Sequence, residues 1–186
     1  MPPPLIVVAG QPGAGKTTLA TKLAAELHLP LLTRDSIKEA LADEFGVETI
    51  AESQRLGAAA FRALYRVLDQ MLPAGCGAVV EANFGKGMAE TELQPFVQRT
   101  SAALVHCQTT RAIAMQRYAE RVGSPGRHWS HLDAERVKLL ESPEVAGSWD
   151  RAGPMDLGVP TLIVDTTDGY VPSFAEIEAF CRKCMP

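Results

Sequence analysis

The sequence predicts an α/β fold in which helices cover both faces of a five-stranded parallel sheet. Two observations predict it. Short apolar runs rich in β-branched residues recur along the chain, and longer stretches with apolar residues at helical spacing separate them. Strands that alternate with helices form parallel sheets, and such sheets are buried on both faces. The expected strands are residues 5–9, 29–33, 77–82, 102–107 and 161–165.

The segments between the strands predict the helices. The first carries Leu19, Leu23 and Leu27 at helical spacing, and the others are expected at 36–45, 53–72, 90–100, 111–122, 133–141 and 173–183. Two stretches rich in glycine and proline, 123–131 and 144–158, are interpreted as part of a mobile lid and as a crossover. With no linker or repeat between them, residues 1–186 are expected to form a single domain whose lid spans about 117–132.

One motif is highly specific. Residues 10–17, GQPGAGKT, match GxxxxGK[ST] at every fixed position and lie between an expected strand and an expected helix. Its glycines let backbone N–H groups turn toward phosphates, and the following helix points its positive end at them. The lysine reaches the β- and γ-phosphates, and the threonine hydroxyl binds Mg²⁺. The residues expected to hold a nucleoside triphosphate are Gly10, Gly13, Ala14, Gly15, Lys16, Thr17 and Thr18.

A carboxylate follows the second expected strand. Ligands of parallel sheets bind beyond the carboxyl ends of the strands, so Asp35 would face the glycine-rich loop. A kinase that acts on an alcohol needs a group that takes the hydroxyl proton and orients the oxygen toward the γ-phosphate. Asp35 is the candidate for this general base. The alternative is that Asp35 only caps the next helix, a position where Asp is also favoured.

Three arginines are candidates for contacting the transferred phosphoryl group together with Lys16. Arg117 and Arg121 are four residues apart in an expected helix, where two like charges repel unless an anion lies near them. Arg127 follows in the glycine-rich lid segment. All three could stabilise charge in the transition state, as arginine fingers do. The alternative is a solvated face on which Glu120 pairs with Arg117.

Glu81 ends the third expected strand and is a candidate metal ligand. It could hold Mg²⁺ through a water, beside Thr17, or it could be a buried structural glutamate. Asn83, Phe84 and Lys86 come next in the chain. Because they too would follow a strand at the carboxyl edge of the sheet, they are candidates for lining an acceptor pocket.

Other features carry weaker signals. Cys181 and Cys184 form a CxxC without a second pair to complete a zinc site, which favours a plain C-terminal helix. His128 and His131 form an HxxH with no evident third ligand, which disfavours a metal site. Arginines at 55, 62 and 66 share one side of an expected helix and are interpreted as a solvated face, with binding of an anionic acceptor as the alternative.

Composition limits the classes of partner. The net charge is −4 at pH 7, which disfavours a long nucleic-acid track but does not exclude a short oligonucleotide end. No run of about 18 apolar residues is present, and the N-terminus enters an expected core strand without a leader pattern. We therefore expect a cytoplasmic protein that does not contact membranes. The sequence carries no signal for the oligomeric state.

Five stretches are similar to a known family. They are residues 10–18, RDSIKEAL at 34–41, AVVEANF at 78–84, RYAERVGSPGRHWSH at 117–131 and LIVDTT at 162–167. They resemble the small AAA-type phosphate-loop (P-loop) kinases related to chloramphenicol phosphotransferase, zeta toxins, gluconate and shikimate kinases, and the kinase half of bacterial-type polynucleotide kinases. The resemblance covers nearly the whole chain, and its first stretch is the specific one.

The resemblance implies an adenylate-kinase-like P-loop NTPase core with a helical lid. It implies ATP with Mg²⁺ as phosphate donor and transfer of the γ-phosphate to a hydroxyl. It makes Asp35 the general base and the three arginines at 117, 121 and 127 the lid cations, and it places residues 166–169 near the adenine.

The chain departs from the family pattern at two positions. Several relatives carry a second acidic residue where this chain has Thr33, and many have Asp where it has Glu81. The segments 36–70 and 83–95, which choose the acceptor in this family, match no single member well. We expect the acceptor to be a hydroxyl on a small molecule. The alternatives are the 5′-hydroxyl of a nucleotide or polynucleotide, and a nucleotide-binding switch that has no dedicated acceptor.

Overall fold

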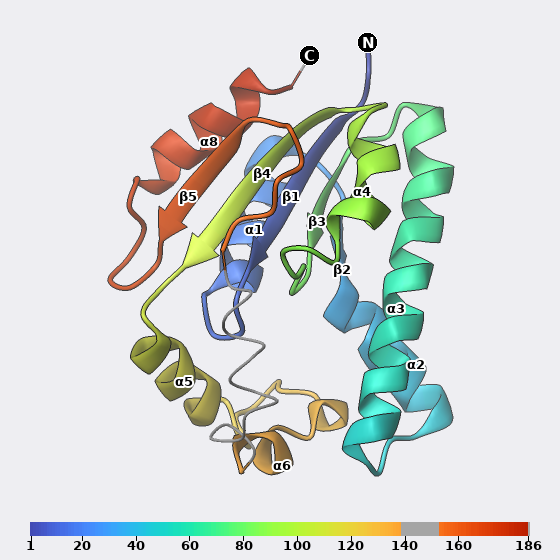
Figure 1. The fold of residues 1–186 in the computed structure, drawn as a ribbon, viewed down its shortest axis with the longest axis vertical. Helices are drawn as coiled ribbons and strands as arrows, with labels where there is room; N and C mark the ends of the chain where they lie inside the picture. The colour runs from blue at the N-terminus through green and yellow to red at the C-terminus, as the bar shows by residue number, and fades with distance from the viewer. Residues whose placement is uncertain (139–152, 186) are drawn as a thin grey trace.

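The computed structural model describes residues 1–138 and 153–185 and contains the predicted sheet (Figure 1). The five strands are all parallel and lie in the order β2–β3–β1–β4–β5. They are β1 (Pro4–Gly10), β2 (Leu31–Thr33), β3 (Ala78–Glu81), β4 (Ser101–Gln108) and β5 (Thr161–Asp165). The fold class predicted from the sequence is confirmed.

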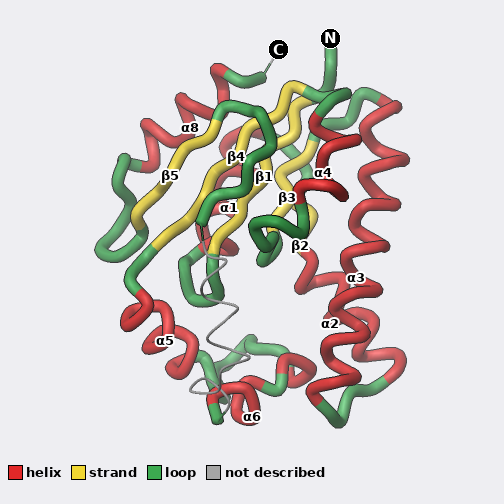
Figure 2. The backbone as a smooth tube through the Cα atoms, in the orientation of Figure 1, coloured by secondary structure: helices red, strands yellow, loops and turns green. Residues whose placement is uncertain are grey.

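Helices cover both faces of the sheet (Figures 1 and 2). One face packs against α3 (Ile50–Met71) and α4 (Glu90–Val97), and the other against α1 (Lys16–Leu27) and α8 (Phe174–Lys183). Beyond the carboxyl ends of the strands lie α2 (Arg34–Phe45), α5 (Arg111–Glu120) and α6 (Asp133–Val137). Two short 3-10 helices are η1 (Leu72–Ala74) and η2 (Trp129–His131).

The central strand β1 explains these layers. Successive side chains of a strand point to opposite faces of the sheet. The side chains of Leu5, Val7 and Ala9 pack with α3 and α4, whereas Ile6 and Val8 pack with α1 and α8. All five are completely buried. A strand covered on both faces has an unbroken apolar sequence rather than an alternating one, which is why the run was recognisable.

The structure corrects the ends of several elements. β2 is shorter than the predicted 29–33, and α2 begins at Arg34, directly after it. The predicted start of α3 at residue 53 is wrong, because Thr49 and Glu52 form a capping box and the helix begins at Ile50. Further along the chain, α4 ends at Val97 and α5 at Glu120, before the predicted 100 and 122.

The C-terminal part of the chain follows the prediction where it is described. Residues 133–137 form a helix, whereas 139–141 of that predicted helix and 144–152 of the predicted loop lie outside the described residues. Residues 153–158 contain neither helix nor strand. The CxxC lies on α8 and just after it, as free thiols, so the plain helix is confirmed. None of the described helices is both long and apolar enough to span a membrane.

The buried face of α3 leads to a prediction about stability. Leu64 is completely buried between α3 and the sheet, so Leu64→Ala removes apolar contacts and leaves a cavity. We expect the free energy of unfolding, measured by urea denaturation, to fall by about 2–5 kcal/mol. Arg66→Ala on the exposed side of the same helix is the control and should change it by less than about 0.5 kcal/mol. Equal losses in the two variants would contradict this packing.

Candidate active site

The glycine-rich loop joins β1 to α1 at the carboxyl edge of the sheet. Gly10 and Gly13 have positive φ angles of 140° and 79°. A Cβ atom would lie 2.2 Å from the Cys107 carbonyl oxygen at Gly10, and 2.3 Å from that of Ala114 at Gly13. Only glycine fits where the loop passes so close to β4 and α5. No side chain caps the N-terminus of α1, whose N–H groups therefore suit an anion.

Lys16 is buried at the start of α1 and lines a cleft beside the loop. Its Nζ donates a hydrogen bond to the backbone carbonyl of Gln11 at 3.0 Å. Burial lowers the pKa of Lys16, and the nearby carboxylates of Glu81 and Asp35 oppose that shift. The two acids thus favour the charged ammonium in a poorly hydrated place, where a bound phosphate would interact with it strongly.

Thr17 and Glu81 both line the cleft and offer oxygen ligands to it. The Thr17 hydroxyl donates a hydrogen bond to Glu81 Oε2 at 3.2 Å. Glu81 is the last residue of β3, and burial raises the pKa of its carboxyl while Lys16 opposes the shift. Mg²⁺ prefers hard oxygen ligands and keeps several of its waters. This donor set fits a Mg²⁺ ion that also binds nucleotide phosphates.

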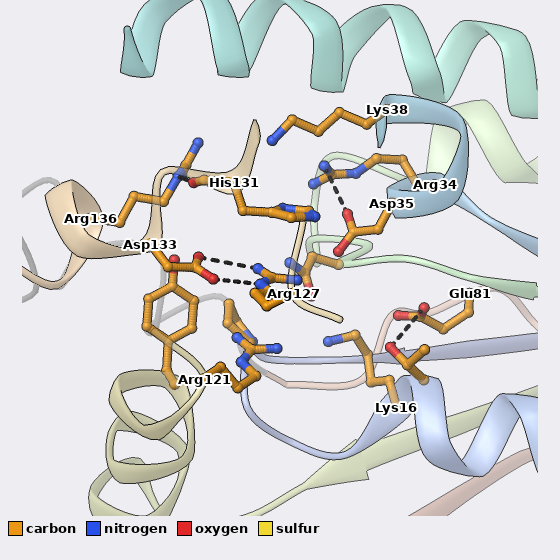
Figure 3. Close-up of a pocket in the computed structure, with 14 residues that line it drawn as sticks. Lys16, Arg34, Asp35, Lys38, Glu81, Arg121, Arg127, His131, Asp133 and Arg136 are labelled. Carbon is orange, nitrogen blue, oxygen red and sulfur yellow. Dashed lines mark hydrogen bonds and ion pairs between the residues drawn. The ribbon is translucent and has the colours of Figure 1, made fainter. Parts of the chain in front are cut away.

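Asp35 lies in the first turn of α2 and faces the same cleft (Figure 3). The residue that caps α2 is Thr33, whose hydroxyl accepts a hydrogen bond from the backbone N–H of Ser36 at 3.1 Å. The alternative in which Asp35 is the helix cap is therefore wrong. Its side chain is left for other contacts.

Cationic side chains surround the Asp35 carboxylate. Burial alone would raise its pKa, but Arg34, at 3.1 Å, and the more distant His131, Arg127 and Lys16 lower it overall. The carboxylate is therefore ionised at neutral pH. An ionised carboxylate with a fixed cationic neighbour can accept both a hydrogen bond and a proton from a bound alcohol.

The segment predicted to form the lid supplies two arginines to this cleft. Arg121 directly follows α5, and Arg127 lies in the loop after it. Asp133 holds Arg127 by accepting hydrogen bonds from both Nε and Nη2 (Figure 3). The Arg121 guanidinium lies 4.8 Å from the centroid of the Tyr118 ring, and burial together with Arg127 lowers its pKa. An anion between the two arginines would relieve their repulsion.

Arg117 lies apart from this cleft. Its Nη2 donates hydrogen bonds to the backbone carbonyls of Thr166 at 2.8 Å and Thr167 at 3.0 Å, just after β5. Glu120, the partner expected on a solvated face, instead accepts a hydrogen bond from Gln116. The structure therefore separates Arg117 from the other two arginines. It places Arg117 against the segment that the resemblance puts near the adenine.

Several residues that line the cleft were missed by sequence reasoning. Lys38 is only 2% exposed, and its Nζ donates hydrogen bonds to the Ser53 hydroxyl at 2.7 Å and the Ser130 carbonyl at 3.1 Å. It thereby joins α2, α3 and the lid. Its position three residues after Asp35, on the same side of a helix, was the available signal. The others are Arg34, Tyr118, Asp133 and Arg136.

His128 and His131 both contact α2. His128 Nε2 lies 3.0 Å from Asp43 Oδ1, and His131 Nε2 lies 2.8 Å from Glu39 Oε1. Within residues 1–138 and 153–185, no group of three or more His, Cys, Asp or Glu side chains could hold a metal ion. These two pairs and the hydrogen bond from Lys38 to the Ser130 carbonyl connect residues 128–131 to α2.

Positive charge dominates the cleft, which encloses about 110 Å³. Six cationic side chains among the described residues line it, against three carboxylates. The cations are Lys16, Arg34, Lys38, Arg121, Arg127 and Arg136, and the carboxylates are Asp35, Glu81 and Asp133. Such an excess is typical of sites that bind phosphate groups. The cleft thus brings together all the predicted catalytic and metal-binding residues except Arg117.

A model of the AAA domain family matches residues 5–142, well over half of the chain. The chain belongs to this family. It is a P-loop nucleotide-binding domain of the kinase type, as the resemblance of its motifs implied.

Similar proteins carry kinase names. A shikimate kinase from Thermobifida fusca is 31% identical over 179 residues, which cover 95% of this chain and 93% of that protein. A cytidylate kinase from Ignicoccus hospitalis is 44% identical over 46 residues, 25% of this chain, so the match spans only 27% of that relative's length. The crystal structure of a candidate kinase from Chloroflexus aurantiacus has a TM-score of 0.84 at 29% identity and covers 100% of both chains.

Lys38 leads to a pH-dependent prediction. Burial, Arg136 and Arg34 lower its pKa to about 8, from an ordinary value of 10.5. Between these values the unfolded chain binds more protons than the folded protein, so the stability contributed by this group rises with pH. In Lys38→Met this rise is absent. We expect wild type to gain about 1–2 kcal/mol of unfolding free energy relative to the variant between pH 7 and pH 9.5.

The measurement is urea denaturation of both proteins at the two pH values. Lys183→Met, which changes an exposed lysine at the end of α8, is the matched control and should show no such gain. A constant difference between wild type and Lys38→Met at both pH values would show that Lys38 keeps an ordinary pKa.

Proposed function

We propose that this protein is an ATP-dependent kinase that transfers the γ-phosphate to a hydroxyl of a small molecule, with Asp35 as general base. The observation that carries the proposal is one cleft lined by Lys16 and Thr17 of the P-loop and by Asp35 of α2. Hydrolysis or switching does not require a carboxylate opposite the P-loop, whereas an alcohol acceptor does. Similarity to a shikimate kinase over most of the chain supports a small hydroxylated acceptor.

The chain's own groups would bind the nucleotide phosphates at one end of the cleft. The loop and the N-terminus of α1 present backbone N–H groups, and Lys16 contributes an ammonium charge that Glu81 and Asp35 favour against the effect of burial. Thr17 and Glu81 would hold Mg²⁺, which when bound neutralises charge on the β- and γ-phosphates. Transfer then requires an acceptor oxygen placed in line with the γ-phosphorus.

The proposed step conserves atoms and charge. The acceptor oxygen forms a bond to the γ-phosphorus while the bond to the β–γ bridging oxygen breaks, and ADP leaves. The hydroxyl proton passes to the Asp35 carboxylate, which Arg34 holds in place. Arg121 and Arg127 face the cleft from the lid and would stabilise charge on the transferring group. The contacts of the lid with α2 and α3 would exclude water.

A nucleotide acceptor is the second candidate. The excess of cations in the cleft suits an acceptor that itself carries phosphate, and the short matches to cytidylate kinases point in the same direction. A nucleotide switch without an acceptor predicts slow hydrolysis that no hydroxyl compound accelerates. Three pools of candidate acceptors therefore distinguish these functions. The pools are small alcohols and sugars, nucleosides and nucleotides, and short oligonucleotides.

Asp35→Asn tests the base directly. The amide keeps the size of the side chain but cannot accept the proton, so the acceptor-stimulated release of ADP from Mg·ATP should fall about 10²–10⁴-fold. Binding of a fluorescent ATP analogue should change little. Glu44→Gln, an exposed position near the end of α2, is the control and should keep full activity. Undiminished acceptor-stimulated transfer in Asp35→Asn would remove Asp35 from the mechanism.

Substitution of Arg121 and substitution of Arg117 should change different kinetic constants. Because Arg121 lines the cleft, Arg121→Ala should lower kcat about 10²-fold or more. Because Arg117 instead fixes the backbone of Thr166 and Thr167, Arg117→Ala should mainly raise the KM for ATP and leave kcat within a few-fold. Steady-state ADP release at varied ATP concentration measures both. Equal losses of kcat in the two variants would instead indicate that Arg117 also contacts the transferred phosphoryl group.

A further inference from the structure

A second hollow lies beside the catalytic cleft. It encloses about 320 Å³, against about 110 Å³ for the cleft itself. One wall is the middle of α3, and the other is the segment from the end of β3 into α4. The lining residues on α3 are Ala58, Phe61, Arg62 and Tyr65, and those on the other wall are Asn83, Phe84, Gly85, Met88, Ala89 and Glu92. We refer to it as the α3–α4 pocket.

The floor of this pocket is apolar and aromatic. The ring of Phe61 stacks on Tyr65 with centroids 6.1 Å apart and meets Phe84 at 5.7 Å. Met88 also lines the pocket, although 62% of its surface is exposed. Phe84 belongs to the core, and Phe61 and Tyr65 pack against it, so the pocket is lined by the outer side of the core. Apolar side chains that line a hollow are typical of sites that bury a ligand, because their contact with water is unfavourable.

Apart from the Tyr65 hydroxyl, the polar side chains that line the pocket are exposed. Arg62, Asn83 and Glu92 are all exposed, whereas Phe84 is only 4% exposed. A hydroxyl group buried against the rings of Phe61 and Phe84 would therefore lose its hydrogen bonds to water without replacing them. A flat apolar ring would lose none and would gain stacking contacts with the aromatic side chains.

Two connections join this pocket to the proposed base. Asn83 lines both the pocket and the catalytic cleft. The Phe61 ring also lies 5.3 Å from the guanidinium carbon of Arg34, and Arg34 forms the ion pair with Asp35. A molecule that packs against Phe61 and passes Asn83 would thus extend from the pocket toward Asp35.

We propose that the α3–α4 pocket binds the body of the phosphate acceptor, and that this acceptor is an alcohol built on an aromatic or alicyclic ring. The inference rests on the proposed kinase function and specifies its substrate class. A cavity of roughly 150 Å³ is enough for benzene, so this pocket accommodates a substituted ring. The hydroxyl, outside the pocket, gives its proton to Asp35 as its oxygen bonds to the γ-phosphorus and ADP leaves. Polyhydroxylated sugars do not match the apolar floor.

The test fills the pocket without touching the catalytic cleft. Ala58 is exposed and lines the pocket, so Ala58→Trp places an indole in it with little effect on folding. Ala59→Trp is the matched control, since Ala59 is also exposed on the same helix but is not among the residues that line the pocket. Met88→Lys, which places a charge against the apolar wall, is a second variant. Thermal unfolding checks that all three fold.

Two readouts separate the pocket from the kinase activity. Saturation-transfer NMR without ATP measures binding of 2-phenylethanol and cyclohexylmethanol, with ribose and gluconate as polyol comparisons. ADP release from Mg·ATP measures transfer to the same compounds and to nucleosides. We expect the ring alcohols to bind and be phosphorylated by wild type and Ala59→Trp. In Ala58→Trp and Met88→Lys their KM should rise at least tenfold, with binding of the ATP analogue unchanged.

The other outcomes overturn the inference in distinguishable ways. If polyols or nucleosides are phosphorylated equally well by wild type and Ala58→Trp, the kinase function stands and the pocket is not the acceptor site. If ring alcohols bind and Ala58→Trp abolishes binding, but no compound stimulates ADP release, the proposed function fails and the pocket serves another ligand. If the ring alcohols neither bind nor react, the assignment of substrate class is wrong.

Discussion

The site depends on the position of β1 in the middle of an all-parallel sheet. Val7 of β1 pairs with Val80 of β3 on one side and Leu104 of β4 on the other, so the strand cannot shift without breaking two ladders. Its end fixes where the P-loop begins. Because parallel strands end at one edge, Asp35 in the first turn of α2, directly after β2, and Glu81 at the end of β3 both lie close to that loop.

Charge is the second organising constraint. Most cations of the cleft already have protein partners: Arg34 pairs with Asp35, Arg127 with Asp133, and Lys38 donates to two oxygens. Arg121 differs, since it rests on an aromatic ring and its buried Nε has no hydrogen-bond partner within the described part of the chain. A guanidinium not committed to a carboxylate is the one whose energy changes most when an anion arrives.

The sequence predicted the features that depend on residues close together in the chain. The GxxxxGK[ST] motif and the apolar run of β1 identified the P-loop and the central strand, and the TxxE at residues 49–52 would have identified the start of α3. Contacts between distant segments could not be predicted in this way. The partners of Lys38 come from α3 and the lid, and Arg117 meets residues 166–167 only because β5 lies next to β4. Spacing within one helix grouped Arg117 with Arg121, whereas the structure places its guanidinium against the backbone of residues 166–167.

A single helix, α3, contacts both Lys38 and Arg34, which line the cleft on either side of Asp35 in the sequence. Near its N-terminus, α3 places Ser53 against Lys38 and the lid, and in its middle it places Phe61 beneath Arg34. Eight residues, about two helical turns, separate Ser53 from Phe61 on the continuous helix Ile50–Met71. Leu64 and Leu68 pack this helix on the sheet. Because Ser53 and Phe61 lie on one continuous helix, we infer that a displacement of α3 at the α3–α4 pocket would change two contacts at once: that of Ser53 with Ser130, and that of Phe61 with Arg34, the ion-pair partner of Asp35.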